Sequence, residues 1–191
     1  MPGDRPAGDR TVMTPSPVDR LLTASLIIGP VLSLIADVVY ATRGWDDPTA
    51  GLLHVLAAAG YALVVIRLAA HGTGWPVVAL LVVGVLGVVG NAGYGFNTIH
   101  VSLGDTDLVD ATGAATVIKP LGLCFPLTLL LAAVVLRRAA PMWTVVLLAL
   151  SAVAWPVAHI ANVGWLAVAV NVLLVAAFGG VFAAQANTRS S

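Results

Sequence analysis

The sequence predicts an all-α integral membrane bundle of six transmembrane helices, connected up and down, with both termini in the cytoplasm. The first observation is composition: 59% of the 191 residues are hydrophobic and 9% are charged, whereas soluble domains are about one-quarter charged. The second is a set of six apolar stretches, each long enough to cross a hydrocarbon core of about 30 Å. The third is an uneven distribution of basic residues between the connections.

The first span follows a segment rich in Pro, Gly, Asp and Arg, so residues 1–20 are predicted to be a disordered cytoplasmic tail. Span 21–40 has full membrane length, which argues against a cleaved secretory signal peptide. The remaining spans are separated by polar or Gly/Pro breaks and cover 50–70, 75–97, 114–136, 142–160 and 164–184. Residues 21–184 therefore form one transmembrane domain, followed by a short cytoplasmic tail at 185–191.

Two of these elements carry local signals of packing. The third span has a glycine at every third position, at Gly84, Gly87, Gly90 and Gly93. A stripe of small residues lets a neighbouring helix backbone approach closely. Between the fifth and sixth spans, residues 162–164 (Asn-Val-Gly) predict a helix cap and a tight hairpin turn.

Basic residues predict the orientation, because Lys and Arg near span ends are retained in the cytoplasm. With the N-terminus inside, the cytoplasmic segments hold seven of the nine basic residues: Arg5, Arg10, Arg20, Arg67, Arg137, Arg138 and Arg189. Arg43 and Lys119 fall on the outer side, together with six of the nine aspartates. The predicted location is the plasma membrane, and the preference for Arg over Lys together with the Ala, Val, Leu and Gly content favours a bacterial source.

The charge balance excludes some classes of function. Nine basic and nine acidic residues give a formal net charge of zero, and the isoelectric point of about 6.9 leaves no basic surface for nucleic acid. Cys124 is the single cysteine in the sequence, so it has no intrachain partner and Cys-rich metal sites are excluded.

Polar residues within or next to the spans are the candidate functional residues, because burying them in lipid costs several kcal/mol unless they are paired or solvated. They concentrate at the predicted outer ends, and together with two deeper asparagines they predict an outward-facing ligand pocket. The candidate residues are Asp37, His54, Asn91, Asn97, His100, Lys119, His159, Asn162 and Asn171. Trp45, Tyr94, Trp155 and Trp165 are predicted to line the same vestibule.

The residues leave several functions open. The favoured hypothesis is an outward-facing pocket for a small ligand or partner, since pockets combine apolar walls with a few converging polar groups. No catalytic residue is assigned, no cofactor is predicted, and binding is favoured over catalysis. The expected partners are the lipid bilayer and a second copy or another membrane protein.

Two alternatives belong to other classes. His54, His100, His159 and Asp37 form an admissible ligand set for a divalent metal, which would make the protein a metal-dependent membrane hydrolase. An ion pair between Asp37 and Lys119, with histidines relaying protons, would instead suit a small-solute transporter working as an oligomer. The apolar inner half weighs against transport. A further interpretation gives these residues no function, because polar side chains near helix ends are readily solvated by nearby water and headgroups. His71 and the acidic loop 101–113 in particular are expected to be in water.

Overall fold

The computed structural model describes residues 15–190, with side chains up to residue 186. It is all-helical and has six helices long and apolar enough to span a membrane, as predicted. A short 3-10 helix, η1, precedes the fourth of them. The elements are α1 (Pro17–Arg43), α2 (Pro48–Ala69), α3 (Trp75–Ser102), η1 (Gly113–Val117), α4 (Ile118–Leu136), α5 (Met142–Ile160) and α6 (Gly164–Ser190).

The two terminal helices extend beyond the predicted spans. Helix α1 begins at Pro17, inside the segment 1–20 predicted to be a disordered tail. The Oγ of Ser16 accepts a hydrogen bond from the Asp19 N–H at 3.1 Å, and proline at the first position suits a helix start. Helix α6 continues to Ser190 through the predicted tail 185–191. The rest of the tail prediction, at 1–14 and 191, lies outside the described residues.

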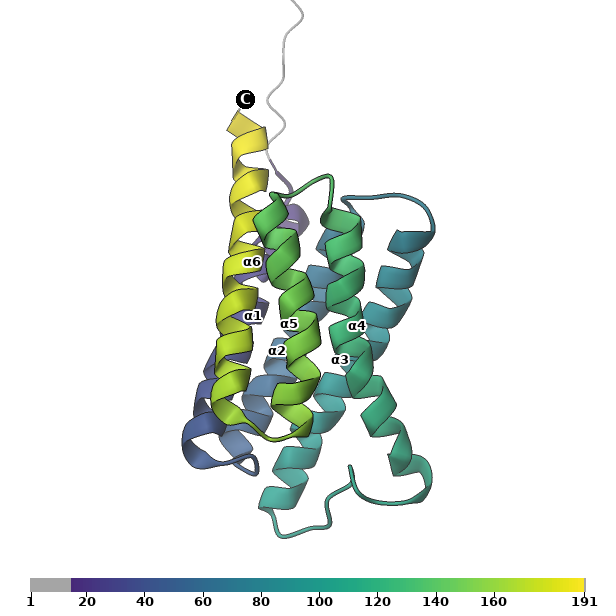
Figure 1. The fold of residues 1–191 in the computed structure, drawn as a ribbon, viewed down its shortest axis with the longest axis vertical. Coiled ribbons are helices and arrows are strands. Elements are labelled where there is room, and N and C mark those ends of the chain that lie inside the picture. The colour runs from purple at the N-terminus through teal and green to yellow at the C-terminus, as the bar shows by residue number, and fades with distance from the viewer. Residues whose placement is uncertain (1–14, 191) are drawn as a thin grey trace, which may run out of the picture.

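The six helices form a closed ring. Each packs against its neighbours in the sequence, and α1 packs against α6, so the first and last helices close the bundle. Short connections between successive helices enforce this up-and-down order. Helix α1 begins and α6 ends at the same end of the bundle, while the α1–α2, α3–α4 and α5–α6 connections lie at the other end (Figure 1).

Aromatic rings fill the centre of the ring of helices. Tyr61 of α2 meets Phe125 of α4 edge-on at 4.9 Å between centroids and Phe178 of α6 at 6.0 Å. Phe125 in turn lies 5.6 Å from Trp155 of α5. These residues belong to a cluster of buried apolar side chains drawn from all six helices. Side chains therefore pack the middle of the bundle.

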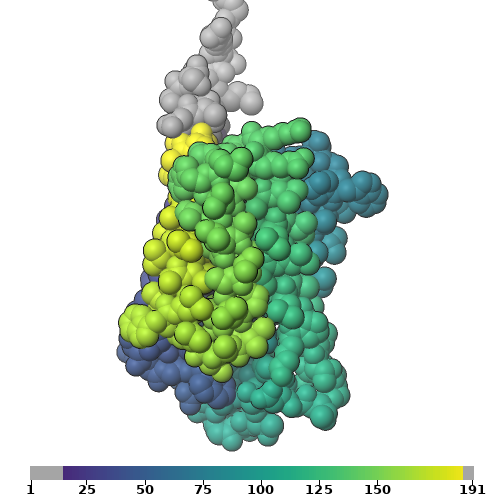
Figure 2. All heavy atoms as spheres, in the orientation of Figure 1, coloured from purple at the N-terminus to yellow at the C-terminus, as the bar shows by residue number. Residues whose placement is uncertain are grey.

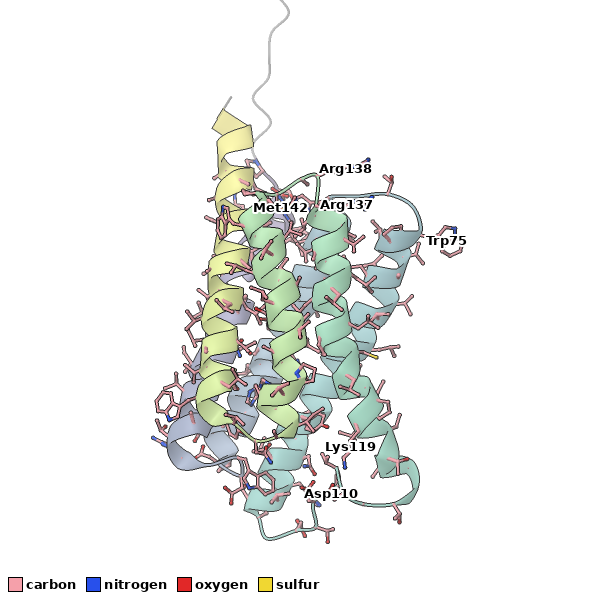
Figure 3. The ribbon with its side chains drawn as sticks, in the orientation of Figure 1. Trp75, Asp110, Lys119, Arg137, Arg138 and Met142 are labelled. Carbon is pink, nitrogen blue, oxygen red and sulfur yellow. The ribbon has the colours of Figure 1, made fainter. Side chains whose placement is uncertain are left out.

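The outward faces of the helices are apolar, which is the reverse of a soluble bundle. Val153 on α5 is 70% exposed, and Trp75, which projects away from the start of α3, is 84% exposed (Figure 3). Helices α5 and α6 present one continuous outer surface, in green and yellow in Figure 2. Large exposed apolar surfaces of this kind mark contact with lipid or with another protein.

The glycine stripe on α3 lets a neighbouring backbone approach, as predicted, at two of its four positions. A Cβ on Gly87 would lie 2.8 Å from the backbone of Phe125, and one on Gly90 would lie 2.3 Å from the backbone of Leu121. A Cβ on Gly84 would instead lie 2.7 Å from the side chain of Val65 on α2. A Cβ on Gly93 would meet nothing within 4 Å. The close approach of α3 and α4 therefore ends between Gly90 and Gly93.

Candidate functional site

A buried carboxylate lies at the centre of the candidate site. Asp37 of α1 has no exposed surface. Its Oδ1 lies 2.9 Å from Nε2 of His54 on α2, and its Oδ2 lies 3.4 Å from Nε2 of His159 on α5. Asn171 of α6 donates an N–H of its side-chain amide to the same Oδ2. Four helices thus each supply one side chain to this group, which we call the Asp37 cluster.

Local structure places these residues at one level in the bundle. Asp47 caps the start of α2, accepting hydrogen bonds from the N–H groups of Thr49 at 2.8 Å and Ala50 at 3.1 Å. This tight turn sets the start of α2 opposite the end of α1, so that His54 faces Asp37. Desolvation raises the pKa of Asp47, but the hydrogen bonds from these two N–H groups outweigh it and hold the pKa below its ordinary value.

The α5–α6 turn positions the other two members of the cluster. Asn162 has a positive φ of 53°, a left-handed conformation that asparagine tolerates better than most residues, and it reverses the chain within three residues as the sequence predicts. Its Oδ1 accepts a hydrogen bond from the Tyr40 hydroxyl at 3.3 Å. The turn is therefore tied to α1, which carries Asp37.

The hydrogen bonding of His159 defines its tautomer. Nδ1 lies 3.1 Å from the carbonyl oxygen of Trp155, and because a carbonyl can only accept, Nδ1 carries a proton. The ring also stacks on Trp155 at 4.2 Å between centroids. In a neutral imidazole the Nε2 is then a lone pair, and it faces a carboxylate oxygen that also lacks a proton. A proton on Nε2 would make this contact an ion pair, and a metal ion between the two atoms would bridge them.

A cavity of about 520 Å³ opens directly above the Asp37 cluster. Its volume is typical of small-molecule sites. Six of the nine candidate residues line it: His54, Asn91, Asn97, Lys119, His159 and Asn162. Asp37 and Asn171 lie behind its two histidines. Three of the four predicted aromatic residues, Trp45, Tyr94 and Trp155, also line the cavity, whereas Trp165 is exposed on the outer surface.

The loop between α3 and η1 forms part of the cavity wall. Asn97, which is buried, donates to Asp107 Oδ1 at 2.8 Å and accepts from the Leu108 N–H at 2.7 Å. Asp107, Val109 and Asp110 consequently line the cavity. The expectation that this acidic loop is solvated holds for Asp110, whose side chain is 75% exposed, whereas Asp107 is partly buried because Asn97 holds it against the cavity.

Two predicted interactions do not form. His100 lies outside the Asp37 cluster and pairs with Asp105, Nδ1 to Oδ2, at 3.4 Å. Lys119 pairs with Asp110 at 2.8 Å, near the mouth of the cavity (Figure 3). The predicted pairing of Lys119 with Asp37 is wrong because α1 and α4 do not pack against each other in the described part of the chain.

A second polar cluster, which sequence reasoning missed, lies near the termini. Arg67 of α2 donates to Asp19 of α1 at 2.7 Å and, through Nε and Nη2, to Oε1 of Gln185 of α6 at 2.9 and 2.6 Å. His71 accepts from the Gln185 amide at 3.0 Å and donates to the Arg67 carbonyl at 3.1 Å. We call these residues the Arg67 cluster. The expectation that His71 is solvated is wrong, and the signal for the cluster was the spacing of Arg67 and His71, one helical turn apart.

The six apolar helices, the packed centre and the polar cavity at one end define a multi-pass membrane protein with a candidate binding site. Comparisons of the chain with family models, with curated proteins and with solved structures found no match. Any function must therefore be argued from the site itself.

Proposed function

We propose that this chain is a plasma-membrane protein that binds a small, positively charged ligand in the cavity above the Asp37 cluster. The observation that carries the proposal is the charge around that cavity. Asp107 and Asp110 line it and Asp37 lies behind its two histidines, whereas Lys119 is the one Lys or Arg among its lining residues. A concave site with an excess of carboxylates concentrates cations.

The remaining lining supports the same class of ligand. Rings of Tyr40, Trp45 and Tyr94 line the cavity, and aromatic faces attract organic cations. Asn91 lines it too. Its side-chain amide offers a ligand both a hydrogen-bond donor and an acceptor.

The packed centre favours binding over passage through the membrane. The rings of Trp155, Phe125 and Tyr61 succeed one another from the cavity floor into the core. A transport path needs polar lining on both sides of the membrane midplane, and this row of rings occupies the middle of the bundle. The proposal is therefore a receptor or accessory protein rather than a carrier.

The cavity is proposed to face the extracytoplasmic side. Arg137 and Arg138 lie at the end of the bundle opposite Lys119 and Asp110 (Figure 3), and basic residues near span ends are retained in the cytoplasm. Cysteines introduced at Arg138 and at Thr106 test this in intact cells. A membrane-impermeant maleimide should label the Thr106→Cys variant alone, and labelling of Arg138→Cys alone would reverse the orientation.

Binding is tested with the purified full chain in nanodiscs, after treatment with a chelator. The probes are tetramethylammonium and choline, with acetate and phosphate as anionic comparisons, and the measurement is thermal stabilisation. Asn91→Trp fills the cavity, and Val89→Trp places the same side chain on a position of α3 that is 51% exposed. Stabilisation by the organic cations should be lost in Asn91→Trp and kept in Val89→Trp. Equal responses in both variants, or responses to the anions alone, would contradict the proposal.

A further inference from the structure

We infer that the floor of the cavity is a binding site for a divalent transition-metal ion, with Asp37, His54 and His159 as its three protein ligands. The inference deepens the proposed function, on which it rests, by naming the cation held deepest in the pocket. It removes His100 from the ligand set that the sequence suggested, because His100 pairs with Asp105 instead.

The ligand atoms are already gathered. One oxygen of Asp37 and one nitrogen of each histidine lie within 4.8 Å of one another. Tetrahedral coordination at 2.0–2.1 Å requires separations of about 3.3 Å between ligand atoms. The distances from Asp37 to the histidines are 2.9 Å from Oδ1 to His54 and 3.4 Å from Oδ2 to His159. Each is close to that value, and binding through one carboxylate oxygen requires the side chains to move closer together than the 4.8 Å limit.

The orientation of His159 is that of a metal ligand. Histidines that bind metals usually donate the other ring N–H to a carboxylate or a backbone carbonyl, which fixes the tautomer. His159 donates from Nδ1 to the Trp155 carbonyl, so in the neutral ring the Nε2 lone pair faces Asp37 Oδ2 at 3.4 Å. A metal ion between the two atoms would form a coordinate bond to each of them.

Asn171 supplies independent support from behind the carboxylate. Its side chain is 1% exposed and donates to Asp37, in the way that outer groups orient a metal-binding carboxylate. Its Oδ1 is buried without a hydrogen-bond partner in the described part of the chain. Buried polar atoms are rarely left unpaired, so the cluster has unused capacity on the side of Asp37.

The ligand types select the metal. Two imidazoles and one carboxylate suit Zn²⁺ and neighbouring transition ions, whereas Ca²⁺ and Mg²⁺ prefer sites built from oxygen. Both histidines line the cavity, so the position left open by three protein ligands faces the pocket. In a site with three protein ligands, water can occupy the position that remains open.

The test uses the full chain carrying no polyhistidine tag, loaded with Zn²⁺, desalted and assayed for zinc per chain. Co²⁺ titration follows the visible absorption bands of tetrahedral coordination. We expect one zinc per chain, and a loss of affinity of more than about 100-fold in Asp37→Asn and in His54→Gln. His100→Ala is the matched control, because His100 lies outside the cluster, and it should bind zinc like the unaltered chain.

Zinc X-ray absorption of the unaltered chain gives a result that does not depend on how any variant folds. Scattering from two imidazoles supports the site, and a shell of oxygen alone overturns it. Absence of stoichiometric zinc, or equal losses in His100→Ala and His54→Gln, also overturns it. Asn91→Trp separates this inference from the proposed function, since it should lose organic cations and keep zinc.

Discussion

The Asp37 cluster and the Arg67 cluster each place a buried charge among helices α1, α2 and α6, near opposite ends of the bundle. In the Arg67 cluster the guanidinium donates through all three nitrogens and both ring nitrogens of His71 have partners. In the Asp37 cluster the contact from His159 Nε2 to Asp37 Oδ2 is long, at 3.4 Å, and Asn171 Oδ1 has no partner among the described residues. A cavity of about 520 Å³ lies beside the second cluster, and no residue of the Arg67 cluster lines it.

This difference in hydrogen bonding indicates a structural role for the Arg67 cluster and a functional role for the Asp37 cluster. In the Arg67 cluster each guanidinium nitrogen already has an acceptor, so the cluster offers little to a ligand. An incompletely paired cluster next to a cavity still has capacity for a ligand. Burial of a charged side chain therefore does not identify a functional site on its own. The hydrogen bonds that the charged cluster has left unmade are what distinguish the Asp37 cluster.

The largest expected effect on stability tests the Arg67 cluster. Arg67→Met removes a side chain that is 13% exposed, together with its hydrogen bonds to Asp19 and Gln185. We expect a loss of about 3 kcal/mol, at the low end for a broken buried pair because Asp19 is partly exposed. Unfolding in mixed micelles measures it. Arg20→Met, at an exposed position of α1, is the control, and an equal loss there would make the Arg67 cluster unimportant.

The next effect concerns the place where α3 and α4 separate to open the cavity. Gly90→Ala puts a methyl group against the backbone of Leu121, which should cost about 2 kcal/mol through overpacking. Gly93→Ala, one turn further on, meets open space and should not lower the melting temperature. If both variants unfold together at a lower temperature, the helices do not part between these two positions.

Neutralising the other buried charge should change stability least of the three. Asp37→Asn keeps the shape of the side chain and removes a charge whose desolvation is costly, so we expect a change of less than about 1 kcal/mol. Zinc binding should nevertheless be lost. The comparison between the clusters fails if this variant is as unstable as Arg67→Met in the same unfolding assay.

The smallest effect on stability is expected at the α1–α2 turn, which lies at the same end of the bundle as the cavity. The lowered pKa of Asp47 means that its stabilising contribution is present above the ordinary value of 3.8 and is lost as pH falls through the folded value. The stability difference between the unaltered chain and Asp47→Ala should therefore be constant near neutral pH and shrink in acid. A difference that does not change between neutral and acid pH would contradict the capping role of Asp47.

Depth along each helix was predictable from the sequence, whereas rotation about the helix axis was not. Counting residues from the span ends placed Asp37, His54 and His159 in one layer, and the structure brings them together. The same count placed His100 and Lys119 in that layer, yet both side chains pair within the α3–α4 segment instead. Apolar spans with uniform composition carry little information about which face meets which neighbour.

The Arg67 cluster was missed for a related reason. Arg67 and Gln185 lie near span ends, where snorkelling to water is the ordinary expectation for a long side chain. Their pairing depends on α1 extending down to Asp19 and α6 extending beyond residue 184. Neither extension follows from hydropathy, because both segments are polar and their helical structure comes from capping and tertiary contacts.

Helix α6 supplies the amides that complete both clusters, Asn171 for Asp37 and Gln185 for Arg67. Because α6 follows α1 and α2 in the chain, these two helices leave the ribosome before it does. Each charge therefore lacks its α6 amide until the sixth helix inserts beside them.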